Sequence, residues 1–293
     1  MAGQPARTSQ QTAEPTPVAY AGEPGAFAED AVLAARGDVE RRALPGFRDV
    51  FEAVDRGEAA VGVIPIENLV NGTVRENYDL LLEFAVLIVG EVVVPVRLCL
   101  AALPGQGIET IERVYSHIQA LGQAEAFLRT RPWTTLTTYN TAGAGKLIAE
   151  RREAGAAAVL SPRAAALFGL EILADGIESV PDNRTRFFVI ARPDRAGEVG
   201  APHLAGAERR TSLAFWVRNE PGALLMALQA FAGRGVNLSK LESRPSRNRA
   251  WEYVFLADVD ADATEPACAA ALDDLRAVAT QVRVLGSYDR AAS

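Results

Sequence analysis

The 293-residue chain has few of the residues that usually carry redox, metal or covalent chemistry. It contains two cysteines and two histidines, without the spacing of a metal site. Cys99 and Cys268 lie far apart in apolar surroundings, which predicts reduced core residues in a cytoplasmic protein. No glycine pattern completes a dinucleotide fingerprint or a phosphate loop. We therefore expect neither a metal nor a cofactor.

Long hydrophobic runs and an excess of positive charge are also missing. The most apolar stretch, residues 84–103, is interrupted by Glu91, Pro95 and Arg97, so no bilayer-spanning segment is expected. The N-terminus has no basic region followed by an apolar one, which argues against a secretory signal. The formal net charge of −7 disfavours nucleic acid as a partner. These absences favour a small-molecule enzyme or binding protein.

The first large region has the pattern of an α/β domain. Residues 1–17 are rich in Gln, Thr, Ala and Pro and are expected to be a disordered tail. Between residues 18 and 191, short apolar runs alternate with helical segments, and the runs end in residues that also begin helices. Thr73 with Glu76, and Ser116 with Gln119, match capping boxes. Such junctions present free N–H groups to anions, so the pattern predicts an anion-binding cleft with few side-chain cations.

A second, smaller region follows a linker at residues 192–209. Residues 210–289 show the order strand, helix, strand, strand, helix, strand, which is the ferredoxin-like arrangement. The segment has few chemically versatile side chains. This composition predicts a binding module.

The stretch from Asp182 to Ile190 is the most informative in the first region. Its second half is apolar and β-branched, which indicates a buried strand. Its first half places an amide, a hydroxyl and two guanidinium groups at the mouth of that strand. Asn68, Ser116 and Thr141 lie at other strand-to-helix junctions, where each is either a cap or a substrate contact.

Six short segments occur in the order typical of one enzyme family. They are Gly22–Phe27, Pro65–Asn68 with Gly72, Tyr115–Leu121, Asn183–Phe187, Gly222–Leu224 and Glu242–Pro245. With these segments, the chain resembles prephenate dehydratases with a C-terminal ACT domain over nearly its whole length after the tail. Leu69, Ile118 and Ala28 depart from the residues that the family usually has there. Several other stretches look closer to plant arogenate dehydratases.

The resemblance implies a two-lobed catalytic domain like periplasmic binding proteins, at residues 18–191, followed by the ACT domain. The implied reaction converts prephenate to phenylpyruvate in phenylalanine biosynthesis. Arogenate dehydratase is the alternative, and an amino-acid-sensing binding protein is the alternative outside enzymes. L-Phenylalanine is the implied effector, and a homodimer or homotetramer is expected because ACT domains usually pair. No chorismate mutase segment is expected before Val18.

Residue roles follow from the same comparison. We expect Thr185 to hydrogen-bond the departing ring hydroxyl and Arg186 to pair with the substrate's side-chain carboxylate. If Glu67 faces the cleft, it is a second candidate acid. The substrate-binding candidates are Asn68, Glu67, Ser116, Thr141, Asn183, Arg186 and Phe187. The effector-binding candidates are Gly222, Ala223, Leu224, Asn237, Glu242, Ser243, Arg244 and Pro245.

Overall fold

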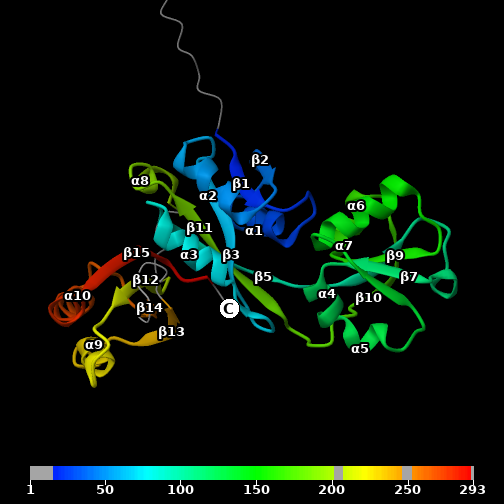
Figure 1. Cartoon of the computed structure of the whole chain (residues 1–293). Coiled ribbons are helices and arrows are strands. Elements are labelled where there is room, and N and C mark those ends of the chain that lie inside the picture. The colour runs from blue at the N-terminus through cyan, green and yellow to red at the C-terminus, as the bar shows by residue number, and fades with distance from the viewer. Residues whose placement is uncertain (1–15, 201–206, 246–252, 292–293) are drawn as a thin grey trace, which may run out of the picture.

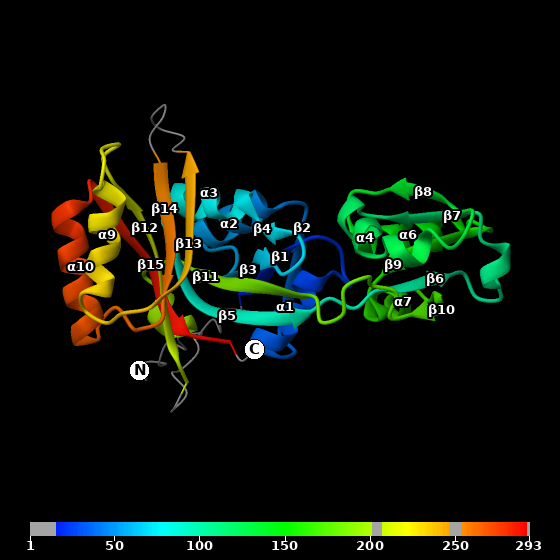
Figure 2. The same ribbon diagram turned by 90° about the horizontal axis from the view of Figure 1, so that it is seen from below.

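The computed structural model describes residues 16–200, 207–245 and 253–291. These residues form three sheets, which belong to two lobes of the first region and a C-terminal domain. The three units lie in a row, with the first lobe in the middle (Figures 1 and 2). The expected tail at residues 1–17 falls almost entirely outside the described residues, as does part of the expected linker.

Lobe 1 is built on a mixed sheet with the order β2-β1-β3-β11-β5, and β4 pairs with β3. Its strands are β1 (Val18–Ala21), β2 (Arg41–Leu44), β3 (Val61–Asn68), β4 (Gly72–Thr73), β5 (Leu87–Pro95) and β11 (Arg184–Ala191). Its helices are α1 (Phe27–Arg36), α2 (Phe47–Asp55), α3 (Arg75–Glu83) and the short α8 (Ala196–Val199). The apolar half of the Asp182–Ile190 stretch is thus a buried central strand, as the sequence predicts.

Lobe 2 has a five-stranded sheet with the order β10-β6-β9-β7-β8. Its strands are β6 (Cys99–Ala102), β7 (Arg113–Ser116), β8 (Thr134–Thr137), β9 (Ala156–Leu160) and β10 (Glu171–Asp175). Its helices are η1 (Ile108–Thr110), α4 (Ile118–Gln123), α5 (Glu125–Leu128), α6 (Thr141–Arg151) and α7 (Pro162–Leu167). The side chains of Asn140 and Ser161 cap α6 and α7 by accepting from the N–H groups of Gly143 and Ala164.

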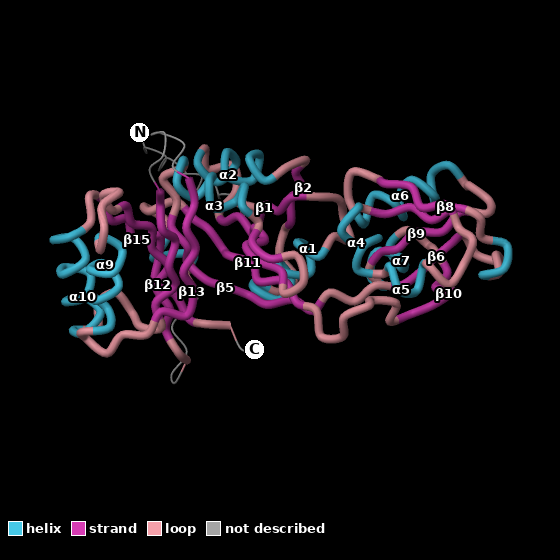
Figure 3. The backbone as a smooth tube through the Cα atoms, turned by 60° about the horizontal axis from the view of Figure 1, so that its bottom comes forward, coloured by secondary structure: helices cyan, strands magenta, loops and turns pink. Residues whose placement is uncertain are grey.

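The chain crosses between the lobes twice. It leaves lobe 1 after β5 and returns at β11, and these two strands pair antiparallel from Arg184↔Pro95 to Ala191↔Leu87. Figure 3 shows both strands running from lobe 1 toward lobe 2. Thr185 therefore lies at the start of a strand that is hydrogen-bonded on both sides, where its backbone has little freedom.

The third unit confirms the ferredoxin-like order. It consists of β12 (Arg209–Trp216), α9 (Ala223–Ala232), β13 (Leu238–Pro245), β14 (Tyr253–Val259), α10 (Pro266–Val278) and β15 (Gln281–Asp289). The sheet order is β13-β14-β12-β15, with every pairing antiparallel. Helices α9 and α10 pack against one face of this sheet (Figure 2).

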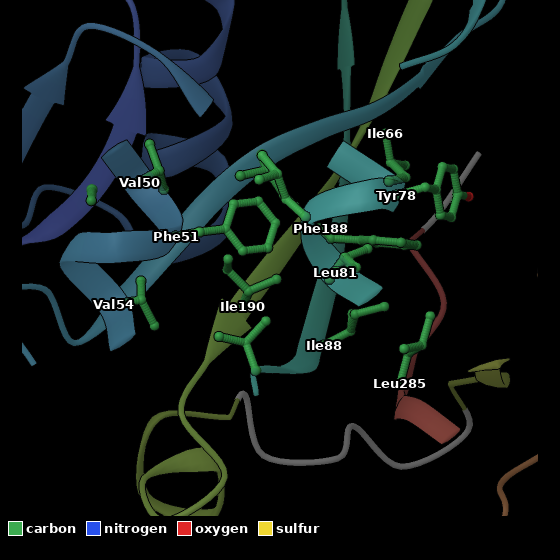
Figure 4. Packing of buried hydrophobic residues seen from close by; sticks show 14 of the residues in the cluster. Val50, Phe51, Val54, Ile66, Tyr78, Leu81, Ile88, Phe188, Ile190 and Leu285 are labelled. Atoms are coloured by element: carbon green, nitrogen blue, oxygen red, sulfur yellow. The ribbon is translucent and has the colours of Figure 1, made fainter. Parts of the chain in front are cut away.

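The other face of that sheet packs against lobe 1. One continuous apolar cluster contains Phe51, Tyr78 and Phe188 of lobe 1 together with Leu285 and Tyr288 of β15 (Figure 4). The rings of Phe188 and Tyr288 meet edge to face at 5.6 Å. Because so much apolar surface is shared, we expect lobe 1 and the C-terminal domain to move as one body.

Candidate active site

A cleft with a volume of about 770 Å³ lies between the two lobes. Lobe 1 contributes the loops that precede α1, α2 and α3, and lobe 2 contributes the segments that begin α4 and α6. Thr185 and Phe187 of β11 lie in its lining, and Thr141 lies there from lobe 2. Apart from His117, only two of the described lining residues are of a type that is charged at neutral pH, and these are Arg75 and Glu76.

Asn68 and Thr185 form a hydrogen-bonded pair in this lining. They are partners in the β3–β11 ladder, and Asn68 Nδ2 lies 2.9 Å from Thr185 Oγ1. The same amide nitrogen donates to Asn183 Oδ1 at 2.9 Å. Both Asn68 and Thr185 are at least nine-tenths buried. The pair is therefore held rigidly at the cleft surface.

The orientation of the Asn68 amide follows from its backbone neighbours. Its Oδ1 accepts hydrogen bonds from the N–H groups of Val70 (3.0 Å) and Asn71 (2.9 Å), which can only donate. Its NH₂ group must then face Thr185, so the Thr185 oxygen accepts. The proton of the Thr185 hydroxyl has no acceptor in the described part of the chain. The hydroxyl is thus prepared to donate into the cleft.

A β-bulge brings this pair together. The β3–β11 register shifts by one residue between Arg186 and Phe187, so that Glu67 pairs with Arg186 while Pro65 pairs with Phe187. In a regular strand, Asn68 would share a face with Ile66, which lies in the apolar cluster between lobe 1 and the C-terminal domain. The bulge turns Asn68 to the face of Thr185 and Phe187.

Two helix N-termini from opposite lobes also reach the cleft. The first residues of α1 and of α6 lie in its lining, with Ala26 and Asn140 at their N-caps. First-turn N–H groups have no partner inside their helix and carry positive potential. The predicted anion-binding cleft therefore has backbone donors on both sides.

Arg75 is the functional candidate that the sequence analysis missed. The capping-box pattern begins α3 at Thr73, but the structure places Thr73 in β4 and begins the helix at Arg75 after Val74. Arg75 is exposed, lines the cleft and has no ion pair among the described residues. The signal that identifies it is its place in the first turn of a helix at the cleft wall.

Arg186 lies on the far face of β11, which corrects its predicted role as a substrate anchor. Its Nη1 lies 2.7 Å from Asp258 Oδ2 of the C-terminal domain, and its guanidinium also contacts Glu91 and Glu67 at 3.4 Å. Burial lowers the pKa of Arg186, but its acidic neighbours, Asp258 first among them, together outweigh burial and leave the pKa above its ordinary value. Arg186 remains charged in a buried position outside the cleft.

Glu67 is the second residue that lies outside the cleft. It pairs with Arg186 and, at 3.0 Å, with Lys240 of the C-terminal domain. The condition set for its role as an acid, that it face the cleft, is not met.

Ser116 and Asn183 are buried beneath the cleft rather than in its lining. Ser116 Oγ donates to the Val159 carbonyl at 2.6 Å and ties β7 to β9, while His117 takes the cap position of α4. Asn183 supports Asn68 from behind. Neither side chain lies in the cleft lining, so the structure does not place Ser116 or Asn183 for the expected direct contact with substrate. Asn183 instead holds Asn68 in position.

The lobes are linked directly beside the cleft. Glu23 of lobe 1 accepts from Lys146 (3.0 Å) and from the Tyr139 hydroxyl (3.2 Å) of lobe 2. Burial and the Glu23 carboxylate raise the pKa of Tyr139, so it stays neutral at physiological pH. The Gly25 carbonyl accepts from Ser161 Oγ at 3.2 Å, and a Cβ at Gly25 would lie 2.9 Å from Ala164. Glycine is required there, also because its φ is +87°.

Comparison with known proteins decides the family. The family model for prephenate dehydratase matches residues 18–195, and the model for the ACT domain matches residues 211–277. The chain belongs to the prephenate dehydratase family. It is 40% identical to arogenate dehydratase/prephenate dehydratase 2 of Arabidopsis thaliana over 282 residues, which is 92% of this chain and 72% of the relative.

Two solved structures are similar over nearly their whole lengths. The prephenate dehydratase of Arthrobacter aurescens, solved with L-Phe, has a TM-score of 0.81 and 33% identity, and the match covers 93% of this chain and 90% of that one. GqqA, described as a novel type of quorum quenching acylase, has a TM-score of 0.83 and 32% identity, with 93% and 97% covered. The two-lobed catalytic fold followed by an ACT domain is therefore confirmed.

The predicted effector residues of this prephenate dehydratase family member fall in two places. Gly222, with φ +84°, caps α9, and Ala223 and Leu224 begin that helix. On β13, Glu242 and Arg244 face lobe 1, whereas Ser243 and Pro245 are exposed. Asn237 Nδ2 donates to Asp260 at 2.7 Å. A direct contact of these residues with phenylalanine stays a prediction.

Within residues 16–200, 207–245 and 253–291, no group of three or more His, Cys, Asp or Glu side chains is placed to hold a metal ion. In the same ranges, no helix has the length and apolar character needed to cross a membrane.

Proposed function

We propose that this chain converts prephenate to phenylpyruvate, carbon dioxide and water, and that the Thr185 hydroxyl assists departure of the ring hydroxyl. The observation that carries the proposal is the Asn68–Thr185 pair. Asn68 occupies the acceptor side of the Thr185 oxygen at 2.9 Å, which leaves the hydroxyl proton directed to the cleft. A fixed donor at the position where negative charge develops is a large source of transition-state stabilisation.

The chemistry needs little else from the protein. The bond between the ring and the ring carboxylate breaks, and the electron pair of that bond enters the ring. The bond between the opposite ring carbon and the hydroxyl oxygen breaks at the same time. The ring becomes aromatic, carbon dioxide leaves, and the hydroxyl leaves as water with one added proton. A threonine hydroxyl is a weak acid, so Thr185 acts here by hydrogen bonding to the leaving oxygen, and the added proton comes ultimately from solvent.

The substrate's two carboxylates require positive partners. Arg75 is the one arginine or lysine among the described residues of the lining. We assign it to the carboxylate of the keto-acid side chain, in place of Arg186. The N-termini of α1 and α6 supply backbone donors to the other carboxylate. Phe187, which is 2% exposed, lines the cleft beside Thr185 and offers an apolar surface to the ring.

Arogenate is the second candidate substrate, because it carries an ammonium group where prephenate has a keto group. Glu76 follows Arg75 in the cleft wall and offers a carboxylate to such a group. The Arabidopsis relative, whose name includes both activities, supports keeping both substrates. Acylase activity is named for GqqA and is not part of this proposal.

The deciding experiment incubates the pure protein with prephenate and with arogenate separately and follows phenylpyruvate and phenylalanine. Turnover of prephenate is the expected result. A Glu76→Gln variant is the matched control, because it should lower arogenate turnover selectively if Glu76 holds the ammonium group. Binding of either compound without turnover would favour an amino-acid-sensing protein and contradict the enzyme.

We also propose L-phenylalanine as the ligand of the ACT domain, supported by its presence in the Arthrobacter structure. The strand β13 lies at an edge of the described ACT sheet, with Leu241 exposed on it and Leu225 and Met226 exposed on α9. These features support pairing of ACT domains in a homodimer or homotetramer. Titration calorimetry and sedimentation velocity test the two claims. A cytoplasmic location stays a prediction, to be checked by cell fractionation.

A further inference from the structure

The ACT strand β13 presents two different faces. Lys240, Glu242 and Arg244 alternate with Ser239, Leu241 and Ser243 along it. The first three are partly buried against lobe 1, and the other three are exposed. Period-two alternation explains this split, because successive side chains of a strand point to opposite sides. The motif Glu242–Pro245 therefore has its two charged side chains on the face that meets the catalytic domain.

Arg244 contacts the N-terminal half of α3. Its guanidinium contacts both carboxylate oxygens of Asp79, at 2.8 and 3.1 Å, and Nη1 also donates to the Arg75 carbonyl at 2.6 Å. The side chains of Arg244 and Asp79 are only 14% and 12% exposed. A two-pronged ion pair shielded from water fixes geometry strongly. The carbonyl that Arg244 holds belongs to the cleft residue Arg75.

Glu242 is hydrogen-bonded to the neighbouring strand β4. Its Oε2 accepts a hydrogen bond from Thr73 Oγ1 at 2.6 Å. Lys240 contacts β3 and β4, with its Nζ 3.0 Å from Glu67 Oε1 and 3.3 Å from Thr73 Oγ1. Thus three successive inward side chains of β13 contact the segment that runs from Glu67 to Asp79.

That segment is a wall of the cleft. Every residue from Asn71 to Glu76 lies in the cleft lining, including Thr73 and Arg75. The pairing of β4 with β3 covers only two residue pairs, so the wall has little ladder support of its own. The ACT strand holds it from behind.

We propose that Glu242 and Arg244 are positioning residues for the catalytic cleft, holding the β4–α3 wall so that Arg75 meets the substrate. The inference rests on the proposed function, because Arg75 is assigned there to the substrate carboxylate. It differs from the expectation that Glu242 and Arg244 contact the effector directly. A ligand on the exposed face of β13 would act on the cleft through these same two side chains.

The kinetic test removes the Arg244–Asp79 ion pair, called the clamp below, from each side. Asp79→Asn leaves the ACT sequence untouched, and Arg244→Gln removes the partner. Each variant should raise KM about 3- to 30-fold with kcat nearly unchanged, because the wall binds substrate while Thr185 stays in place. The double variant should lose less than the sum of the two single losses, since both substitutions remove the Arg244–Asp79 ion pair. Arg276→Gln, which loses an exposed pair with Asp273 on α10, is the matched control and should behave as wild type.

A second pair of variants guards against a folding defect. Thr73→Val removes the hydroxyl that donates to Glu242 while the side-chain volume stays nearly constant, and Thr73→Ser keeps that hydroxyl. The valine variant should raise KM and the serine variant should recover it. Unchanged KM in Asp79→Asn and Arg244→Gln, or full additivity in the double variant, would overturn the proposal.

Hydrogen exchange separates this inference from the proposed function. The amides of residues 71–76 should exchange faster in Arg244→Gln than in Arg276→Gln, whether or not a substrate is known. Wild-type protein that turns over neither prephenate nor arogenate would contradict the function alone. Equal exchange in the two variants would contradict the clamp alone.

Discussion

The two faces of the β3–β11 ladder carry opposite chemistry within two residues. On the cleft face, Asn68 and Thr185 form an uncharged pair at 2.9 Å. On the other face, Glu67 and Arg186 are charged and meet Lys240 and Asp258 of the ACT domain. The cleft face therefore offers mostly neutral donors, while the joint between lobe 1 and the ACT domain is held by charges. A motif that looks like one functional unit in the sequence serves two sites in the fold.

The largest expected effect is on stability, from Arg186→Met. The variant leaves the side chains of Asp258 and Glu91, which are 3% and 1% exposed, without this partner. Breaking a buried ion pair typically lowers the free energy of unfolding by about 3–5 kcal/mol. Urea unfolding followed by circular dichroism measures it. A normally stable variant with a strongly raised KM would instead restore Arg186 as a substrate anchor and break the comparison.

Thr185→Val should have the next largest effect, on the opposite face of the same strand. We expect kcat to fall by roughly 10²–10³ because one fixed donor is lost from the transition state. Thr185→Ser keeps the hydroxyl and is the matched control. Steady-state kinetics with each substrate measure the effect, and a valine variant with wild-type kcat would remove Thr185 from the mechanism.

Arg75→Gln tests the single arginine of the described cleft lining. Loss of a charged hydrogen bond to a carboxylate should raise KM by about tenfold, with a smaller change in kcat. The control is Arg129→Gln, which loses only an exposed pair with Glu125 on α5. If KM does not change, the substrate carboxylate is held by the helix N-termini instead.

The smallest expected effect concerns acid stability of the ACT domain. Burial raises the pKa of Asp262, but hydrogen bonds from Thr264 and Arg209 outweigh it and leave the pKa below its ordinary value. The ionised carboxylate thus stabilises the fold above an unfolded-state pKa of about 3.9, and this contribution is lost as pH falls through the lower, folded-state value. Melting curves below about pH 4 should show a lower midpoint. Asp262→Asn should be less sensitive to pH in that range.

Local signals predicted the framework well. The ferredoxin-like order, the strand that contains Phe187 and Phe188, and the caps Asn140 and Ser161 all follow from periodicity and capping rules. The two predicted capping boxes, which begin at Thr73 and Ser116, were wrong. The Thr73 hydroxyl donates to Glu242 and the Ser116 hydroxyl donates to the Val159 carbonyl, so both hydroxyls form tertiary hydrogen bonds in place of local caps.

The amino-acid sequence determined which residues could do this chemistry, namely a threonine hydroxyl at the start of an apolar strand and polar residues at the junctions that begin helices. It also determined that few metal-binding or strongly nucleophilic side chains are present. Only the tertiary structure decided which face each residue occupies. One extra residue in β3 turns Asn68 toward Thr185, and alternation along β11 sends Arg186 to the ACT domain. Such choices depend on strand register and on what packs against each face, and neither is encoded within a short motif.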